Sequence, residues 1–235
     1  TGCVKFKQAW TVQPDGSGKM TMTLGFSEQM LAMSDEDPFA DLDNPAEMLD
    51  EEDNGWVAFT QPKITTRDGF KFATFTGYFE DINQVSFSGD GGNGEMDATT
   101  YTLADGTLTV TNGMLGQAVA SMAEDQQMQD PQTRAMMAPM LQGLEMTESY
   151  EVFGNVTDAE GFTADGRTAA TTLTADDMLA DTPPKIAGLD DGNLTIRFDP
   201  AGWADEAGWK KELADAKARW EQIKAEAAAE AITTE

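Results

Sequence analysis

The first residues of the chain alternate between apolar and polar side chains, with a turn sequence in the middle. The apolar positions are Val4, Phe6, Trp10 and Val12 before the turn, and Met20, Met22, Leu24 and Phe26 after it. The turn itself is Pro14-Asp15-Gly16-Ser17-Gly18. A period of two places every second side chain on one face of a strand, so the pattern predicts a hairpin with one apolar face. Gln8 interrupts the apolar series and is expected at a rim or in a hydrogen bond.

The hairpin pattern recurs along the chain. Strands over 56–87 turn at Arg67-Asp68-Gly69, and a hairpin over 101–110 turns at Asp105-Gly106. Strands over 150–156 and 167–173 join across Ala164-Asp165-Gly166, and a last strand covers 193–198. Because hairpins follow one another with helices inserted or appended, the sequence predicts an α+β fold on an antiparallel sheet.

Short helices are predicted where a hydroxyl side chain can cap a first turn. Ser27 precedes a helix over 28–33, and Thr174 precedes a one-turn helix that contains Met178 and Leu179. Seven methionines lie between residues 113 and 146, where two helices are predicted, the second starting at Pro131 and ending near Gly143. These inserted helices are the Met-rich part of the fold.

The end of the chain predicts one long helix, from about residue 205 to 232. Its apolar side chains fall at three- and four-residue steps and form a narrow stripe, Trp209, Leu213, Ala216, Trp220 and Ile223. Oppositely charged residues four apart predict the ion pairs Glu206–Lys210, Asp215–Arg219 and Lys217–Glu221. We expect the stripe to pack on the body of the protein or on a second copy. The predicted organisation is a lipobox remnant and anchor at 1–3, an α+β domain over 4–199, and a helix with its tail over 200–235.

The charge balance limits the partners. Forty-two acidic and fifteen basic residues give a formal charge of −27. We therefore expect the protein to repel anionic lipid headgroups and not to bind nucleic acid. Ten carboxylates lie within Asp35–Asp53. Asp41, Asp43 and Glu52 have the spacing of a calcium loop, but Pro45 and Ala46 occupy two of its essential positions, and Asp90, Asn93 and Glu95 are better explained by a turn. The default is a solvated acidic face, and we predict no metal site and no cofactor.

The chain contains no histidine and a single cysteine, Cys3. Histidine-based triads and zinc sites are therefore unavailable, and carboxylate pairs are too abundant to indicate catalysis, so we predict that the protein is not an enzyme. Thr1-Gly2-Cys3 has the form of the end of a bacterial lipobox, in which the cysteine thiol carries diacylglycerol. The alternative is a free cysteine buried on the first strand.

Three segments together resemble the LppM-like family of bacterial envelope lipoproteins. They are Thr1-Gly2-Cys3-Val4-Lys5-Phe6, the hairpin that closes on Asp15-Gly16-Ser17-Gly18, and Tyr150-Glu151-Val152-Phe153-Gly154-Asn155-Val156 with the hairpin Asp165-Gly166-Arg167. The chain departs from the family pattern at Phe153, where proline is frequent. The resemblance implies lipidation at Cys3, a location on the extracytoplasmic side of the cell envelope, and an association with lipids or glycolipids.

Two functions are compatible with these patterns. In the first, the Met-rich helices and the sheet enclose a hydrophobic groove for a lipid or glycolipid, lined by Met136, Met137 and Met140, because methionine adapts to irregular apolar ligands. In the second, the same residues fill a closed core. The acidic face and the C-terminal helix then hold a protein partner or a second copy of the chain. A closed core and a lipid groove have the same periodicity, so the sequence leaves both open.

Overall fold

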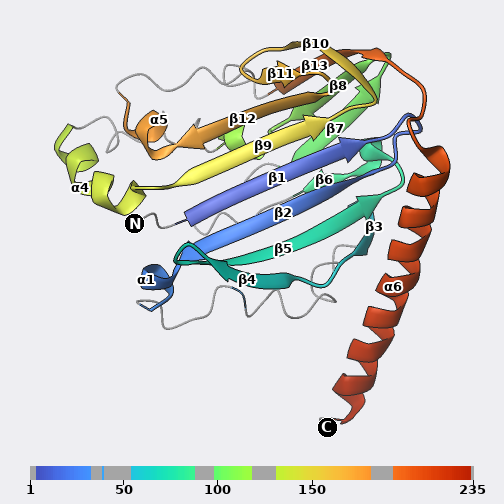
Figure 1. Cartoon of the computed structure of the whole chain (residues 1–235), viewed down its shortest axis with the longest axis horizontal. Coiled ribbons are helices and arrows are strands. Elements are labelled where there is room, and N and C mark those ends of the chain that lie inside the picture. The colour runs from blue at the N-terminus through green and yellow to red at the C-terminus, as the bar shows by residue number, and fades with distance from the viewer. Residues whose placement is uncertain are drawn as a thin grey trace.

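The computed structural model describes residues 4–32, 39, 54–87, 98–117, 131–180 and 193–233 (Figure 1). They form an α+β fold, as predicted, with two β-sheets and a long C-terminal helix. The larger sheet consists of β1 (Val4–Val12), β2 (Gly18–Ser27), β3 (Trp56–Phe59), β4 (Lys63–Arg67), β5 (Phe70–Phe79), β9 (Glu145–Glu151), β11 (Thr163–Asp165) and β12 (Thr168–Thr174). The smaller sheet consists of β6 (Ser86–Phe87), β7 (Thr99–Ala104), β8 (Thr107–Thr111), β10 (Gly154–Ala159) and β13 (Asn193–Pro200).

The strand order brings distant segments together. In the larger sheet it is β11-β12-β9-β1-β2-β5-β3, with β4 also paired to β5, and in the smaller sheet it is β10-β13-β8-β7-β6. The predicted hairpin of β1 and β2 is confirmed, with Trp10 opposite Met20. β9 pairs with β1 in parallel, whereas the other pairs among the described strands are antiparallel. A parallel pair requires a long connection, and residues 13–144 of the chain supply it here.

The prediction of one continuous strand over 150–156 is wrong, because the chain passes from one sheet to the other within this segment. β9 ends at Glu151 in the larger sheet, and β10 begins at Gly154 and pairs with β13 in the smaller one. A Cβ atom at Gly154 would lie 1.9 Å from the carbonyl oxygen of Asp199, so the absence of a side chain permits this close approach. The alternation of apolar residues does not reveal where one strand ends and the next begins, because both strands bury side chains in the same core.

The core lies between the two sheets and is centred on Trp10. Its indole ring contacts Tyr150 and Phe79 of the larger sheet and Tyr101 of the smaller one, at ring-centroid distances of 6.2, 6.0 and 4.5 Å. Gln8, expected at a rim or in a hydrogen bond, is buried on the same face, so the rim position is wrong. Side chains alternate between the two faces of a strand, so Lys5 and Lys7 project from the outer face of the larger sheet, away from the core.

Short helices lie at the end of the sheets where β1 begins (Figure 1). They are α1 (Glu28–Leu31), α4 (Pro131–Leu141) and α5 (Ala175–Leu179). The predicted caps are confirmed: the Ser27 hydroxyl accepts from the Met30 backbone N–H, and Thr174 forms a capping box with Asp177. Pro131 starts α4 as predicted, and Gly143, two residues beyond its end, has the left-handed φ of 78° that favours glycine.

The long helix α6 (Glu206–Thr233) runs along the edge of the larger sheet beside β3 (Figure 1). Trp209 donates from Nε1 to the Ser17 hydroxyl over 2.8 Å, and the Trp220 ring packs edge-on against Phe59 at 5.9 Å. The predicted packing of the stripe is confirmed, and the surface that covers it belongs to the same chain. An edge strand presents unpaired backbone groups, and α6 lies over this one.

The charged residues of α6 are only partly paired as predicted. Lys210 pairs with Glu206, as the spacing indicates. Lys211, however, pairs with Asp215, and Lys217 reaches Glu80 at the end of β5 over 2.7 Å rather than staying on its own helix. The helix thus uses a charge as well as its apolar stripe to contact the body, because Glu80 lies within reach of the Lys217 side chain.

Replacing Trp220 by alanine should destabilise the protein by about 3–5 kcal/mol, the usual cost of removing a large buried aromatic side chain. Trp220 is only 1% exposed, so the substitution leaves a cavity between α6 and the body. The measurement is the free energy of unfolding by urea. Glu221→Ala, an exposed neighbour on the same helix, is the matched control and should change stability by less than about 0.5 kcal/mol. Equal stabilities of the two variants would contradict the packing of α6.

Candidate functional site

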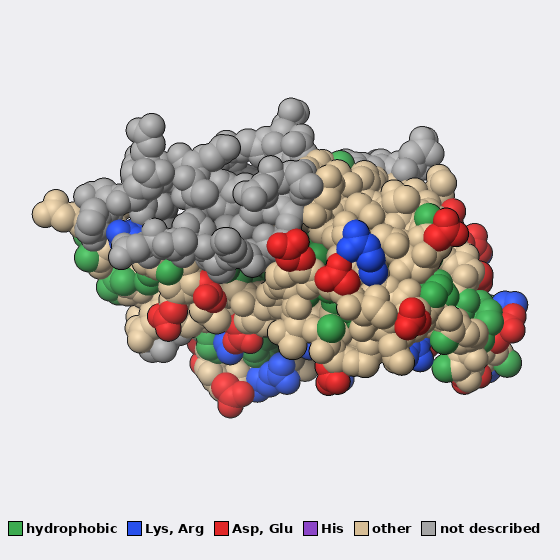
Figure 2. Space-filling model, turned by 90° about the horizontal axis from the view of Figure 1, so that it is seen from above, with side chains coloured by type: hydrophobic (Ala, Val, Ile, Leu, Met, Phe, Trp, Pro, Cys, Tyr) green, Lys and Arg blue, Asp and Glu red, His purple; other side chains and the backbone are tan. Residues whose placement is uncertain are grey.

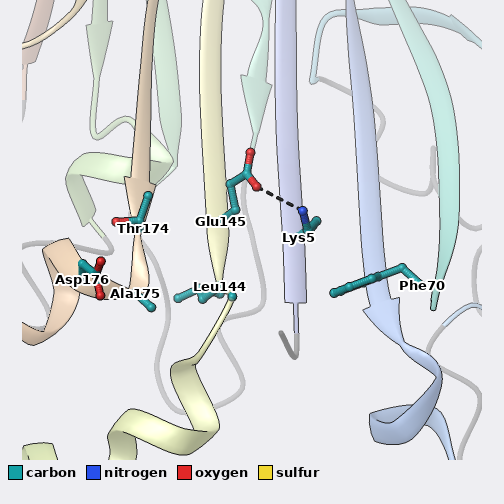
Figure 3. A pocket seen from close by; sticks show the side chains of 8 residues that line it. Lys5, Phe70, Leu144, Glu145, Thr174, Ala175 and Asp176 are labelled. Atoms are coloured by element: carbon teal, nitrogen blue, oxygen red, sulfur yellow. Dashed lines mark hydrogen bonds and ion pairs between the residues drawn. The ribbon is translucent and has the colours of Figure 1, made fainter. Parts of the chain in front are cut away.

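The candidate site lies on the outer face of the larger sheet, at the end where β1 begins. Lys5 of β1 is level with Gly25 of β2 and with Glu145 of β9. Its ammonium group lies 3.2 Å from a carboxylate oxygen of Glu145 and 5.5 Å from the ring centre of Phe70 (Figure 3). The register of three strands therefore brings residues that are up to 140 positions apart in the sequence to one place.

Gly25 shapes the floor of this site. It lies opposite Phe72 of β5, and a Cβ atom at Gly25 would be 2.4 Å from the Phe72 ring. The missing side chain lets the ring lie across β2. The Arg67 guanidinium stands 4.6 Å from the centre of that ring, a cation–π distance, and the Phe70 ring stacks beside it at 5.8 Å. Arg67 and the two rings thus form one layer.

Two hollows meet at the Lys5–Glu145 pair. The first, of about 490 Å³, we call the basic cleft, and it is lined by Lys5, Phe6, Lys7, Thr23, Arg67, Asp68, Phe70, Phe72, Glu145 and Thr147. The second, of about 390 Å³, is lined by Lys5, Phe70, Gly143, Leu144, Glu145, Thr174, Ala175 and Asp176 and opens towards α4 and α5 (Figure 3). Glu145 neutralises Lys5 between the hollows, which leaves Lys7 and Arg67 as the cations of the basic cleft.

Of the three lipid-binding residues expected from the sequence, Met136 is the one whose side chain the structure describes. Met136 lies on α4 and is 75% exposed, so it is a surface residue rather than the wall of a closed groove. Met137 and Met140 belong to the same helix, but their side chains lie outside what the structure describes. Cys3 lies outside the described residues, as do the two acidic segments considered for calcium.

The basic cleft was missed by the sequence reasoning. The available signal was weak: Lys5 and Lys7 occupy the polar face of the first strand, and Arg67 precedes a turn. Neither position is unusual by itself. Only the register of β1, β2, β5 and β4 shows that Lys7 and Arg67 border one hollow and that Gly25 opens its floor.

A buried carboxyl group, Glu148 of β9, is the other notable polar feature. It is 3% exposed and accepts hydrogen bonds from the Tyr150 hydroxyl and from the backbone N–H of Leu115. Burial raises the pKa of Glu148 above its ordinary value, while these two hydrogen bonds oppose the rise. Burial, followed by the charge of Glu148, also raises the pKa of Tyr101. The group is closed to solvent, so it belongs to the core rather than to a site for a dissolved substrate.

The described residues show neither a metal site nor a membrane-spanning helix. They contain no cluster of three or more acidic or cysteine side chains placed to hold a metal ion. Among the helices in that part of the chain, none has the length and apolar character required to cross a bilayer.

Comparison with known proteins gave one structural similarity of note. No family model matches the sequence, and no curated protein matches it either. The folded domain of the Mycobacterium tuberculosis protein LppM, solved by NMR, aligns over 85% of this chain and 91% of its own, with a TM-score of 0.41 and 8% identity. At this TM-score and identity the similarity is weak, and no family model supports it.

The pH dependence of stability should change on replacing Glu148 by glutamine. A carboxyl whose pKa is raised by folding favours the native state most below the unfolded pKa, near 4.5, and loses that contribution as the pH rises through the folded pKa. The wild-type protein should therefore lose stability relative to Glu148→Gln as the pH increases above about 4.5. Urea unfolding at several pH values measures this, with exposed Glu151→Gln of the same strand as the control. Parallel curves for Glu148→Gln and wild type would contradict the raised pKa.

Proposed function

We propose that this protein is a lipid-anchored protein of the bacterial cell envelope, on the extracytoplasmic side, whose role is to bind lipid or glycolipid rather than to catalyse a reaction. One observation carries the proposal. β1 begins at Val4, directly after Cys3, so a diacylglycerol group on Cys3 would be attached one residue from the sheet. Consecutive Cα atoms are about 3.8 Å apart, which leaves no linker between membrane and fold.

The surface at this end supports contact with a bilayer. The large apolar side chains that are exposed in the described part of the chain are Met30 of α1, Ile64 of β4 and Met136 of α4. α1 and α4 flank the beginning of β1 (Figure 1). Apolar side chains are visible at the end that holds α4 and also at the opposite end (Figure 2). Exposed apolar groups on one surface are typical of interaction sites, and Met30 and Met136 lie on the two helices that flank the point where the proposed anchor would join the fold.

A non-catalytic role is supported by the position of Glu148. It is the described carboxyl group whose pKa is raised by burial, and perturbed groups are the usual candidates for acid–base catalysis. Its side chain is closed to solvent between the sheets, where no dissolved substrate reaches it. The carboxyl group fits a structural position better than a catalytic one.

The alternative function, a protein that binds a partner or a second copy through the C-terminal helix, has less support. Trp209, Trp220 and Ile223 are buried against the same chain. A partner would have to use the opposite face of α6, which is rich in charged residues and offers no comparable apolar anchor among the described residues. Interface energies depend chiefly on a few buried aromatic anchors, so we favour the lipid-binding role.

The anchor is tested by mass spectrometry of protein expressed in bacteria with its native signal sequence. We expect an acylated Cys3 as the first residue of the mature chain, because the signal peptidase would remove Thr1 and Gly2 together with the signal. Cys3→Ser is the control and should stay unmodified and unanchored. A free Cys3 thiol in the mature protein would contradict the proposed anchor.

The lipid-binding role is tested by extracting purified Cys3→Ser protein with organic solvent and identifying the lipid that co-purifies. Met136→Asp should reduce the amount several-fold, because it places a charge in the exposed apolar surface of α4. Gln132→Asp introduces the same charge at another exposed position of α4 and should have little effect. Absence of lipid from the Cys3→Ser protein, or equal loss from both aspartate variants, would favour the partner-binding function.

A further inference from the structure

The basic cleft contains cations that have no anionic partner among the residues that the structure describes, in an otherwise acidic protein. Most described bases are paired: ion pairs hold Lys5, Lys19, Arg167, Arg197, Lys210, Lys211, Lys217, Arg219 and Lys224. Lys7, Lys63 and Arg67 have no carboxylate within ion-pair distance among the residues that the structure describes, although acids outnumber bases 42 to 15 in the chain. Two of these three, Lys7 and Arg67, line the basic cleft.

The two cations lie on different strands and at different levels along them. Lys7 is on β1 and Arg67 is on β4, and β2 and β5 lie between them. Lys63 is the residue of β4 that is level with Lys7, so Arg67 lies four residues farther along. Three strand spacings of about 4.8 Å and four rises of about 3.3 Å place the two backbones roughly 20 Å apart. Arg67 leans inward over the Phe72 ring at 4.6 Å. The cleft of about 490 Å³ is therefore larger than a bare anion requires and fits an anion attached to an organic group.

The lining has the chemistry for a phosphate ester. A guanidinium and an ammonium group are the preferred protein partners of phosphate oxygens, and the hydroxyls of Thr23 and Thr147 lie in the same hollow. The Phe70 and Phe72 rings supply an apolar surface beside the cations for the carbon atoms of a headgroup. Asp68 also lines the cleft and opposes an anion there, so its charge sets a limit to the affinity.

We infer that the basic cleft binds the phosphate ester of a lipid headgroup, with Lys7 and Arg67 holding the phosphate and the Phe70–Phe72 layer holding the attached organic group. The inference rests on the proposed function for the source of the ligand, because an anchor at Cys3 places the outer face of β1 at the headgroup level of the membrane. For this one surface it replaces the repulsion of anionic headgroups that the net charge predicts.

The test uses the full chain with Cys3→Ser, so that binding is measured without acylation and its failure is distinct from failure of the anchor. The probes are glycerol 3-phosphate and vesicles of phosphatidylcholine with and without phosphatidylglycerol. We expect binding to the vesicles that contain phosphatidylglycerol, and weaker binding as the salt concentration is raised, because screening weakens contacts between exposed charges. Binding to glycerol 3-phosphate as well assigns the cleft to phosphate esters in general, and binding to vesicles alone assigns it to the lipid form.

Charge-neutral variants locate the site. Lys7→Gln and Arg67→Gln should each weaken binding about fivefold, and the double variant roughly 25-fold, since each basic group near an anionic surface contributes comparably. Lys63→Gln is the matched control: Lys63 is an exposed base on the same strand as Arg67, without an ion pair to any described residue, and it does not line the cleft. Its affinity should stay close to that of the parent protein.

A variant that binds the probes more tightly provides an independent test. Asp68 has a left-handed φ of 53°, a conformation that asparagine also adopts readily, so Asp68→Asn removes the charge and keeps the turn. This variant should bind several-fold more tightly. The inference is overturned if the Cys3→Ser protein binds neither probe, if Lys63→Gln weakens binding as much as Arg67→Gln, or if Asp68→Asn leaves the affinity unchanged. Thermal melting of each variant confirms that the fold is retained.

Discussion

The packing of Trp10 between the two sheets is the interaction on which the rest of the structure depends. Its ring touches aromatic side chains of both sheets, and large aromatic side chains contribute most of the apolar area in such a core. The contact is obtained at a cost, because Trp10 Nε1 is buried without a hydrogen-bond partner among the described residues. A buried unpaired donor costs about 1–3 kcal/mol, which the apolar contacts of the ring offset.

Burial of one face of the larger sheet leaves the other face available for binding. Phe6 and Trp10 of β1 pack into the core, so Lys5 and Lys7 must lie on the opposite side. On that side the described residues leave a hollow at the end where β1 begins, and Gly25 makes room for the Phe72 ring beneath Arg67. The core and the basic cleft are thus two results of the same alternation along β1.

Net charge and local charge lead to different expectations for this protein. A charge of −27 predicts repulsion of anionic surfaces at long range, but salt limits that repulsion to distances of about 10 Å. At shorter range the arrangement of individual charged groups determines whether an anion is attracted or repelled. Bases that are paired with carboxylates contribute little to the attraction of an anion, whereas Lys7 and Arg67 have no carboxylate within ion-pair distance among the described residues. The positions of a few bases without a carboxylate partner among the described residues therefore matter more for the choice of partner than the overall composition of the chain.

The sequence alone determined the α+β class, the first hairpin, the caps at Ser27 and Thr174 and the apolar stripe of the C-terminal helix, because each depends on local periodicity or on neighbouring residues. Only the tertiary structure decided that the segment 150–156 spans two sheets, that β9 lies parallel to β1, and that α6 packs on its own chain. The basic cleft also depends on the tertiary structure, since only the pairing of the strands brings together Lys7, Gly25, Arg67 and Phe72. Pairing between distant strands is chosen by the packing of the whole core, and no local pattern in the chain encodes it.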